Sequence, residues 1–110
     1  MKTNAQTNSI SGDAQYCPKV PLNSVTLSFK ADVHVPRSDV AAALRRHQDG
    51  DWGDVDEEAR RENEIALLQG GRLISSYSSS EGVTFLIVTR TDRSLTTVLL
   101  PSEFVTAVVC

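Results

Sequence analysis

The chain has 110 residues, of which 40% are hydrophobic and 23% are charged, and its formal net charge is −3. This length suits one domain and leaves no room for a second. The acidic balance argues against a general nucleic-acid binder, which usually carries a basic excess, but it leaves a local basic face open. No apolar run approaches the roughly eighteen residues of a membrane span, and the first residues lack the hydrophobic core of a secretory signal. We therefore expect a cytoplasmic protein that does not enter a membrane.

The start of the chain, residues 1–24, is polar and contains almost no large apolar side chain. Such a segment is expected to form a flexible tail, and the predicted domain then covers residues 25–110. Cys17 and Cys110 stand near opposite ends of the chain, without the spacing of a zinc or redox motif. Both are interpreted as incidental thiols.

Two segments before residue 50 follow different periods. Residues 25–33 alternate apolar and polar side chains, which predicts a strand that Pro36 stops. Ser38 is the expected cap of a helix over residues 39–48, because its hydroxyl can accept from the first free amides. Gly50 supplies the left-handed residue that commonly ends a helix.

The sequence GDWGD, residues 50–54, lies between this helix and a second one, and we interpret it as a tight corner. Asp54 and Glu57 fit a capping box for a helix that runs from Val55 to about Leu68 and stops at a pair of glycines. Asn63 falls inside the apolar stripe of this helix, so a buried Asn63 should hydrogen-bond the backbone of the sheet or of the corner. The stripe consists of Val55, Ala59, Ala66 and Leu67, with Ile65 and Leu68 beside it.

The rest of the chain alternates in the manner of strands. Residues 72–78, 83–90 and 95–100 predict three strands joined by tight turns. The middle strand is apolar on both faces, so both faces are expected to be covered. Two helices would cover one face; the 25–33 strand, the C-terminal segment or a second subunit would cover the other. The sequence thus predicts an α+β fold with two short helices packed on a three- to four-stranded, mainly antiparallel sheet.

The acid-rich stretch 49–64 holds eight of the fourteen carboxylates against two arginines. It does not fit a calcium loop, because Asp54 and Arg60 stand where the pattern needs glycine and glutamate. A solvated, capped helix start is the favoured interpretation. Trp52 is interpreted first as a packing anchor and second as a docking residue, since tryptophan is enriched at interaction hot spots. A protein-binding surface would consist of Asp51, Trp52, Asp54, Asp56, Glu57 and Glu58.

No catalytic constellation is recognisable. His34 and His47 have no nucleophile or carboxylate at a diagnostic spacing, so a hydrogen-bonded structural histidine is favoured over a catalytic one. The serines between residues 75 and 80 match no nucleophile motif. We therefore expect a protein that is not an enzyme and needs no cofactor or metal.

Three arginines suggest a second kind of surface. Arg72 begins one predicted strand, Arg90 ends the next, and Arg93 lies in the turn that follows. In an up-and-down meander these residues gather at one edge of the sheet. Structural ion pairs with Asp92 and with the acids of the second helix are favoured over phosphate binding. The three arginines remain the candidate nucleic-acid-binding residues.

Residues 50–104 resemble a family of small proteins encoded on plasmids and integrative elements of proteobacteria. The resemblance rests on GDWGD, an asparagine inside a helix, and a GGR-L-S-Y string. It continues through a DRS-x-TT-x-LLP-x-E ending followed by Phe104, where tyrosine is commoner. The matching residues are Gly50 to Asp54, Asn63, Gly70 to Arg72, Ser75, Tyr77, Asp92 to Ser94, Thr96, Thr97, Leu99 to Pro101, Glu103 and Phe104.

The family carries over no biochemical activity, but the resemblance implies an accessory gene of a mobile genetic element. Small proteins in that setting often block host defence complexes, as anti-CRISPR or anti-restriction proteins do. Two functions are therefore expected as alternatives: a protein that binds and occludes a partner protein, and a nucleic-acid-binding accessory factor. A homodimer formed through a sheet face or the C-terminal segment would account for the apolar residues at 83–100.

Overall fold

The structure of the protein is a computed structural model that describes residues 18–104. Cys17, Cys110 and most of the expected N-terminal tail lie outside the described residues. The predicted boundary of that tail at residue 24 is wrong, because residues 18–24 pack on the domain. Val20 is fully buried and its amide donates to the Gln48 carbonyl (3.1 Å), while the Ser24 carbonyl accepts from the Thr96 amide. The Asn23 side chain adds a hydrogen bond to the Arg93 carbonyl (2.9 Å), so several contacts hold this segment on the domain.

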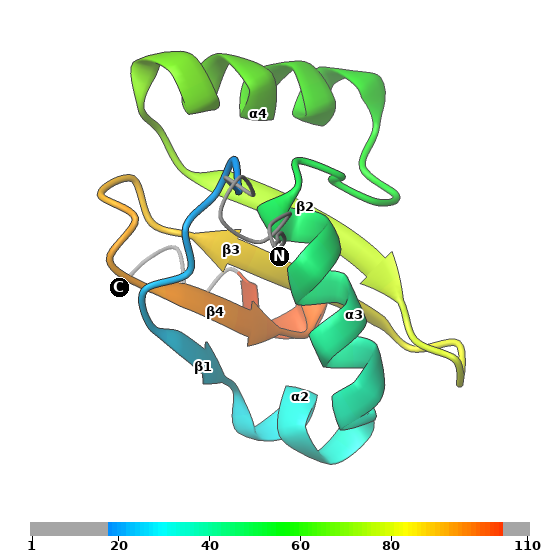
Figure 1. Ribbon diagram of the computed structural model, residues 1–110. Helices are drawn as coiled ribbons and strands as arrows, with labels where there is room; N and C mark the ends of the chain where they lie inside the picture. The colour runs from blue at the N-terminus through cyan, green and yellow to red at the C-terminus, as the bar shows by residue number, and fades with distance from the viewer. Residues whose placement is uncertain (1–17, 105–110) are drawn as a thin grey trace, which may run out of the picture.

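A four-stranded sheet with the order β1-β4-β3-β2 forms the centre of the molecule (Figure 1). The strands β2 (Leu73–Ser78), β3 (Thr84–Thr89) and β4 (Thr96–Leu99) make the predicted antiparallel meander. The short strand β1 (Val25–Leu27) pairs with β4 in parallel. The sheet is therefore mixed, and the predicted α+β class with a mainly antiparallel sheet is confirmed.

The strand predicted over residues 25–33 is wrong beyond Leu27, because Phe29–His34 form helix α2. The Ser28 hydroxyl caps this helix by accepting from the Ala31 amide at 3.1 Å. A strand would have placed Phe29 and Ala31 on one buried face. In the helix, Ala31 is fully buried whereas Phe29 is 80% exposed. The alternation of apolar and polar residues after Ser28 therefore did not indicate a strand.

Both predicted helix starts need correction. Helix α3 (Arg37–Gln48) begins after Pro36, which has no side chain to cap with, so Ser38 lies inside the helix. Proline is compatible with this position, since its φ of −58° lies in the range that the ring allows. Helix α4 (Glu57–Gln69) is capped by Asp56, which accepts from the Ala59 amide at 2.8 Å. The expected Asp54 and Glu57 capping box does not form.

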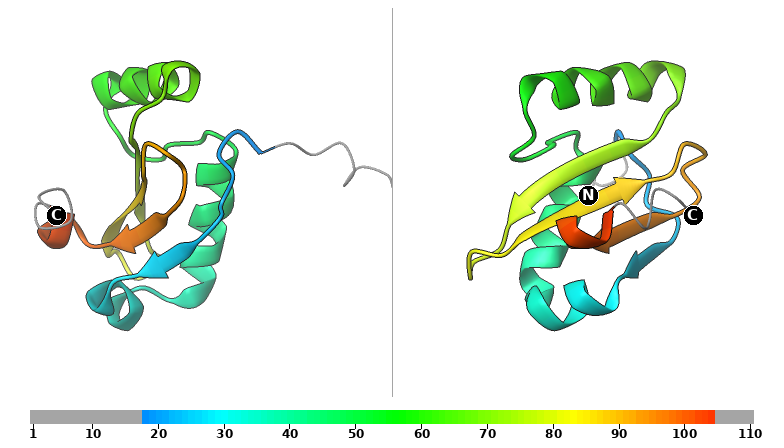
Figure 2. Two further views of the ribbon diagram at one scale, coloured as in Figure 1. Left: turned by 90° about the vertical axis from the view of Figure 1, so that its left-hand side faces the viewer. Right: turned by 180° about the vertical axis from the view of Figure 1, so that it is seen from behind.

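The helices occupy three different places around the sheet (Figures 1 and 2). Helix α3 crosses one face, and the helical residues 101–104 lie on the opposite side in the edge-on view. The sequence predicted that both helices cover one face of the sheet, and this is wrong for α4. Helix α4 lies along the outer edge of β2 and contacts that strand. Within residues 18–104, no helix has the length and apolar content needed to cross a membrane.

Two buried clusters hold these elements together. The larger lies between α3, α2 and the sheet and includes Val40, Ala43, Phe85, Ile87 and Val98. The smaller lies between α4 and the start of β2 and consists of Val20, Trp52, Ala66 and Leu73. Residue Trp52 of the corner therefore belongs to the core beneath α4.

Candidate functional site

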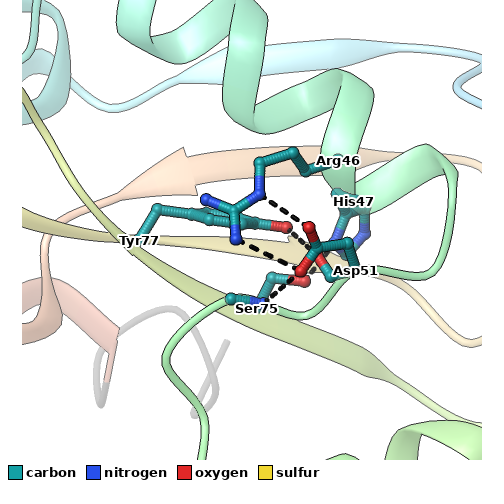
Figure 3. Close-up of polar contacts among 6 residues, drawn as sticks. Arg46, His47, Asp51, Ser75 and Tyr77 are labelled. Atoms are coloured by element: carbon teal, nitrogen blue, oxygen red, sulfur yellow. Dashed lines mark hydrogen bonds and ion pairs between the residues drawn. The ribbon is translucent and has the colours of Figure 1, made fainter.

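The corner 50–54 is fastened first by its acid Asp51. Gly50 ends α3 in the left-handed conformation (φ 80°), as predicted. The Asp51 carboxylate then accepts from the Arg46 guanidinium (Nε at 2.8 Å) and from the Gly53 amide (3.1 Å). The hydrogen bond from Arg46 lowers the pKa of Asp51. Figure 3 shows this pair beside the Tyr77 ring, over which the Arg46 guanidinium stacks at 4.9 Å from the ring centroid.

Tyr77 of β2 connects the sheet to the same corner by a hydrogen bond. Its hydroxyl donates to the Asp51 carbonyl at 2.6 Å (Figure 3). The side chain is almost completely buried, and this burial raises the pKa of Tyr77 to about 12. The phenol is therefore a neutral structural donor at physiological pH.

The backbone of the corner covers the outer edge of β2. The Ser76 amide donates to the Trp52 carbonyl (3.1 Å), and the Asp54 amide donates to the Ser76 carbonyl (2.7 Å). One step along the strand, the Asn63 side chain donates to the Ile74 carbonyl and accepts from the Ile74 amide. The expected backbone bonding of Asn63 is confirmed. These contacts satisfy groups that an uncovered edge strand would present to another chain.

Trp52 is a packing anchor, the first of the two interpretations drawn from the sequence. Its side chain is 3% exposed and its indole NH donates to a Glu64 carboxylate oxygen at 2.8 Å. The ring also meets the His47 imidazole edge-on, with 5.6 Å between centroids. Trp52 is not accessible to a partner in this fold, so it leaves the candidate protein-binding set.

His47 and Ser75 form a buried pair that the sequence spacing did not indicate. The His47 Nδ1 is hydrogen-bonded to the Ser75 hydroxyl (2.6 Å) and its Nε2 to the Thr89 hydroxyl (2.8 Å), which in turn contacts Thr96. All four side chains are buried. Burial is also the main reason why the pKa of His47 falls to about 4. A neutral imidazole that offers one donor and one acceptor suits this bridge between two hydroxyls.

The three candidate nucleic-acid arginines gather at one end of the sheet, but they are not equivalent. The Arg93 guanidinium donates to the carbonyls of Ala66, Gly71, Arg90 and Thr91, and it thereby closes the end of α4. Arg72 and Arg90 are exposed, and Arg72 stacks over the Phe104 ring at 5.7 Å. The ion pairs expected with Asp92 and the acids of α4 do not form among the described residues; Asp92 accepts from Ser94 instead.

The four remaining candidate acids, Asp54, Asp56, Glu57 and Glu58, are exposed around the start of α4. Glu57 is engaged by Arg60, and this hydrogen bond lowers the pKa of Glu57. Between residues 54 and 62 there are five acids and two arginines, so the start of the helix is negatively charged. Charge of this kind favours a basic partner.

Helix α4 also exposes apolar side chains that sequence reasoning missed. Ile65 is 47% exposed and Leu68 is 89% exposed. Their spacing places them with Glu58 and Arg61 on one side of the helix, opposite the buried Asn63 and Ala66. We call Glu58, Arg61, Ile65 and Leu68 the α4 outer face. From the sequence, the two apolar residues were interpreted as flanking the buried stripe.

Among the described residues, no group of three or more His, Cys, Asp or Glu side chains could hold a metal ion. No protein-family model, curated protein or solved structure matches the chain.

Proposed function

We propose that this chain is a non-catalytic protein that binds another protein through the α4 outer face and the acids at the start of α4. The observation that carries this proposal is the exposure of Ile65 and Leu68 on one side of a single helix. Burying one such side chain in a partner contributes about 1.5–3 kcal/mol. Two of them at neighbouring positions supply an apolar anchor for an interface.

The mounting of α4 supports this proposal. The helix is fixed on its inner side by Asn63, Ala66 and the Trp52–Glu64 hydrogen bond. Its outer side therefore faces away from the body of the protein, where a partner can reach it. The partner we expect has an apolar pocket for Leu68 and basic groups that face Asp54, Asp56 and Glu58.

The state of the reactive side chains supports a role without catalysis. Both ring nitrogens of His47 are occupied by hydroxyls, and neither His47 nor Ser75 is accessible to a substrate. The Tyr77 hydroxyl is likewise held by the Asp51 carbonyl. A general base must reach the proton that it abstracts, and a closed pair of this kind does not.

The resemblance to proteins of plasmids and integrative elements supplies the biological setting of the proposal. In that setting we expect the partner to be a host defence complex, such as a CRISPR or restriction effector. Bound in a stoichiometric complex, the chain would occlude a basic surface of that partner. It would need no cofactor for this action.

The nucleic-acid alternative has less support, because Arg93 is engaged by backbone carbonyls and only Arg72 and Arg90 of the three arginines are exposed to phosphates. Each phosphate contact contributes to the salt dependence of binding, and two contacts give a shallow slope. A mobility shift of duplex or single-stranded DNA at low ionic strength, lost in Arg72→Ala/Arg90→Ala, would favour this alternative over protein binding.

The proposal is tested by placing a photo-crosslinking amino acid at Leu68 in the full chain and irradiating bacterial cells that produce it. Glu81 of the β2–β3 turn, which is exposed and belongs to neither proposed surface, is the control position. We expect one protein adduct from position 68 and none from position 81. With the identified partner purified, Ile65→Ser/Leu68→Ser should weaken binding at least about 100-fold, which corresponds to two lost apolar anchors.

Raising the salt concentration should weaken binding of the wild-type chain to the partner, because exposed charges are screened. Absence of an adduct at position 68, or equal adducts from positions 81 and 68, would rule out α4 as the binding surface.

A further inference from the structure

The two edges of the sheet differ in a way that bears on assembly. The β2 edge is covered by the 52–54 backbone and by Asn63, whereas no segment between residues 18 and 104 pairs with the outer side of β1. The Thr96 amide donates to the Ser24 carbonyl (2.8 Å) and the Ser28 amide donates to the Val98 carbonyl (2.9 Å). Residues 24, 26 and 28 therefore point their backbone groups toward β4. Those of Val25 and Leu27 point outward.

Apolar side chains gather beside this open edge. Three of the five large exposed hydrophobic residues lie here: Val25 (38% exposed), Phe29 (80%) and Val33 (57%). A groove of about 600 Å³ opens next to them. Its lining is mostly apolar, with one acid and one base: Leu27, Phe29, Asp32, Arg37, Val40, Ala41 and Leu44. An open edge bordered by apolar surface is the kind of site at which another strand adds.

We propose that a second copy of this chain pairs with β1 in antiparallel fashion about a two-fold axis, which joins the two sheets into one. In the register that uses every outward group, Thr26 faces Thr26 of the second copy and Val25 faces Leu27. The two Val25–Leu27 pairs then exchange four backbone hydrogen bonds. This assembly goes beyond the proposed function and uses neither α4 nor the acids at its start.

The surroundings of the edge suit an identical partner. Val25 and Leu27 lie on the α3 side of the sheet, because they pair with Thr96 and Val98, whereas Thr26 and Thr97 share a hydroxyl contact on the other side. Val25 of one copy therefore extends the apolar lining of the other copy's groove. Asp32 and Arg37, both exposed, form an ion pair at the groove. Because this pair carries no net charge, the groove does not repel a second copy electrostatically.

The covered β2 edge limits growth. An antiparallel edge contact is isologous, since the same surface is used by both copies. After the two β1 edges have paired, each outer edge of the joined sheet is a β2 edge that residues 52–54 and Asn63 already occupy. The assembly therefore closes as a dimer and does not extend into a filament.

Sedimentation equilibrium of the full chain tests the proposal. We expect the wild type to form a dimer. In Val25→Lys and in Phe29→Ser, the dissociation constant of the dimer should rise at least tenfold while the circular dichroism spectrum stays unchanged. Leu68→Lys replaces an apolar residue that is 89% exposed on α4, and this control variant should remain dimeric. A wild-type monomer at all concentrations, or a dimer insensitive to both β1-edge variants, would overturn the proposal. Neither result bears on binding through α4.

Cysteine crosslinking tests the register. In a background with Cys17→Ser and Cys110→Ser, we expect Thr26→Cys to form an intermolecular disulfide on mild oxidation, because facing residues lie within disulfide reach. Thr97→Cys lies on the same side of the sheet but one strand further in, so the two copies of that residue are about 14 Å apart. A crosslink at Thr97 equal to that at Thr26, or none at Thr26, would contradict this register.

Discussion

The imidazole of His47 sits between two hydroxyl groups, and each of its nitrogens has one hydrogen-bond partner. A histidine beside a serine at 2.6 Å would suggest nucleophilic catalysis if the pair were open to a substrate. Here both side chains are fully buried, and the Trp52 ring lies against the imidazole. Because it is buried, the His47–Ser75 pair has a structural role.

This residue should dominate the pH dependence of stability in mildly acidic solution. The pKa of His47 is about 4 in the folded chain, below its ordinary value of 6.5, chiefly because burial disfavours the imidazolium. Between these values the unfolded chain binds more protons. The contribution of His47 is therefore complete above pH 6.5 and is lost as the pH falls toward 4. We expect a loss of about 3 kcal/mol in the free energy of unfolding across this window, measured by urea denaturation.

The control is the other histidine. His47→Gln should flatten the slope between pH 4.5 and 6.5, whereas His34→Gln, a change on the exposed surface of α2, should keep it. The carboxylates with lowered pKa, such as Asp39 and Asp51, act mainly below this window. A slope that survives in His47→Gln would contradict the assignment.

At the scale of the element, the corner 50–54 acts as a short extra strand. Gly53 makes an isolated parallel bridge with Ser76, and its neighbours supply the hydrogen bonds. The close approach is possible only without a side chain. A Cβ at Gly53 would lie 2.1 Å from the Ser76 carbonyl oxygen.

We expect Gly53→Ala to lower the free energy of unfolding by about 3 kcal/mol or more, because it adds this collision to a positive φ of 76°. Gly82→Ala is the matched comparison. Its φ is 83°, but nothing lies within 4 Å of the added Cβ, so only the conformational cost of about 1 kcal/mol should appear. Thermal or urea unfolding of both variants measures the difference. Equal losses would mean that the corner relaxes away from β2.

At the scale of the whole molecule, α4 buries fewer side chains than α3: Asn63 and Ala66, against Val40, Ala43 and His47. Helix α3 packs against one face of the sheet through the larger buried cluster. Helix α4 contacts β2 and packs on the smaller cluster around Trp52. Figure 1 shows α4 beyond the β2 edge of the sheet. A helix held in this way should open without global unfolding.

Native-state hydrogen exchange should therefore show faster exchange in residues 57–69 than in β3, by at least about tenfold, or about 1.4 kcal/mol in opening free energy. Asn63→Ala should widen this difference, because it removes both hydrogen bonds to Ile74. Equal protection of α4 and β3 in the wild type would show that the molecule opens as one unit.

Local patterns predicted the regular elements well. The meander was predictable because alternation and turn residues act within a few positions, as in the strands at residues 73–78 and 84–89. The left-handed Gly50 was predictable for the same reason. The short helix α2 was missed, since Ser28 can continue a strand or cap a helix, and the burial of Ala31 decides between them.

The sequence by itself determined the α+β class, the three antiparallel strands and the acidic start of α4, because each depends on residues close together in the chain. Only the tertiary structure decided that Trp52 is buried, that His47 meets Ser75 twenty-eight positions away, and that Leu68 is exposed. It also decided which sheet edge is covered and which is open. Such contacts join distant segments, and their energies depend on burial that no local pattern encodes.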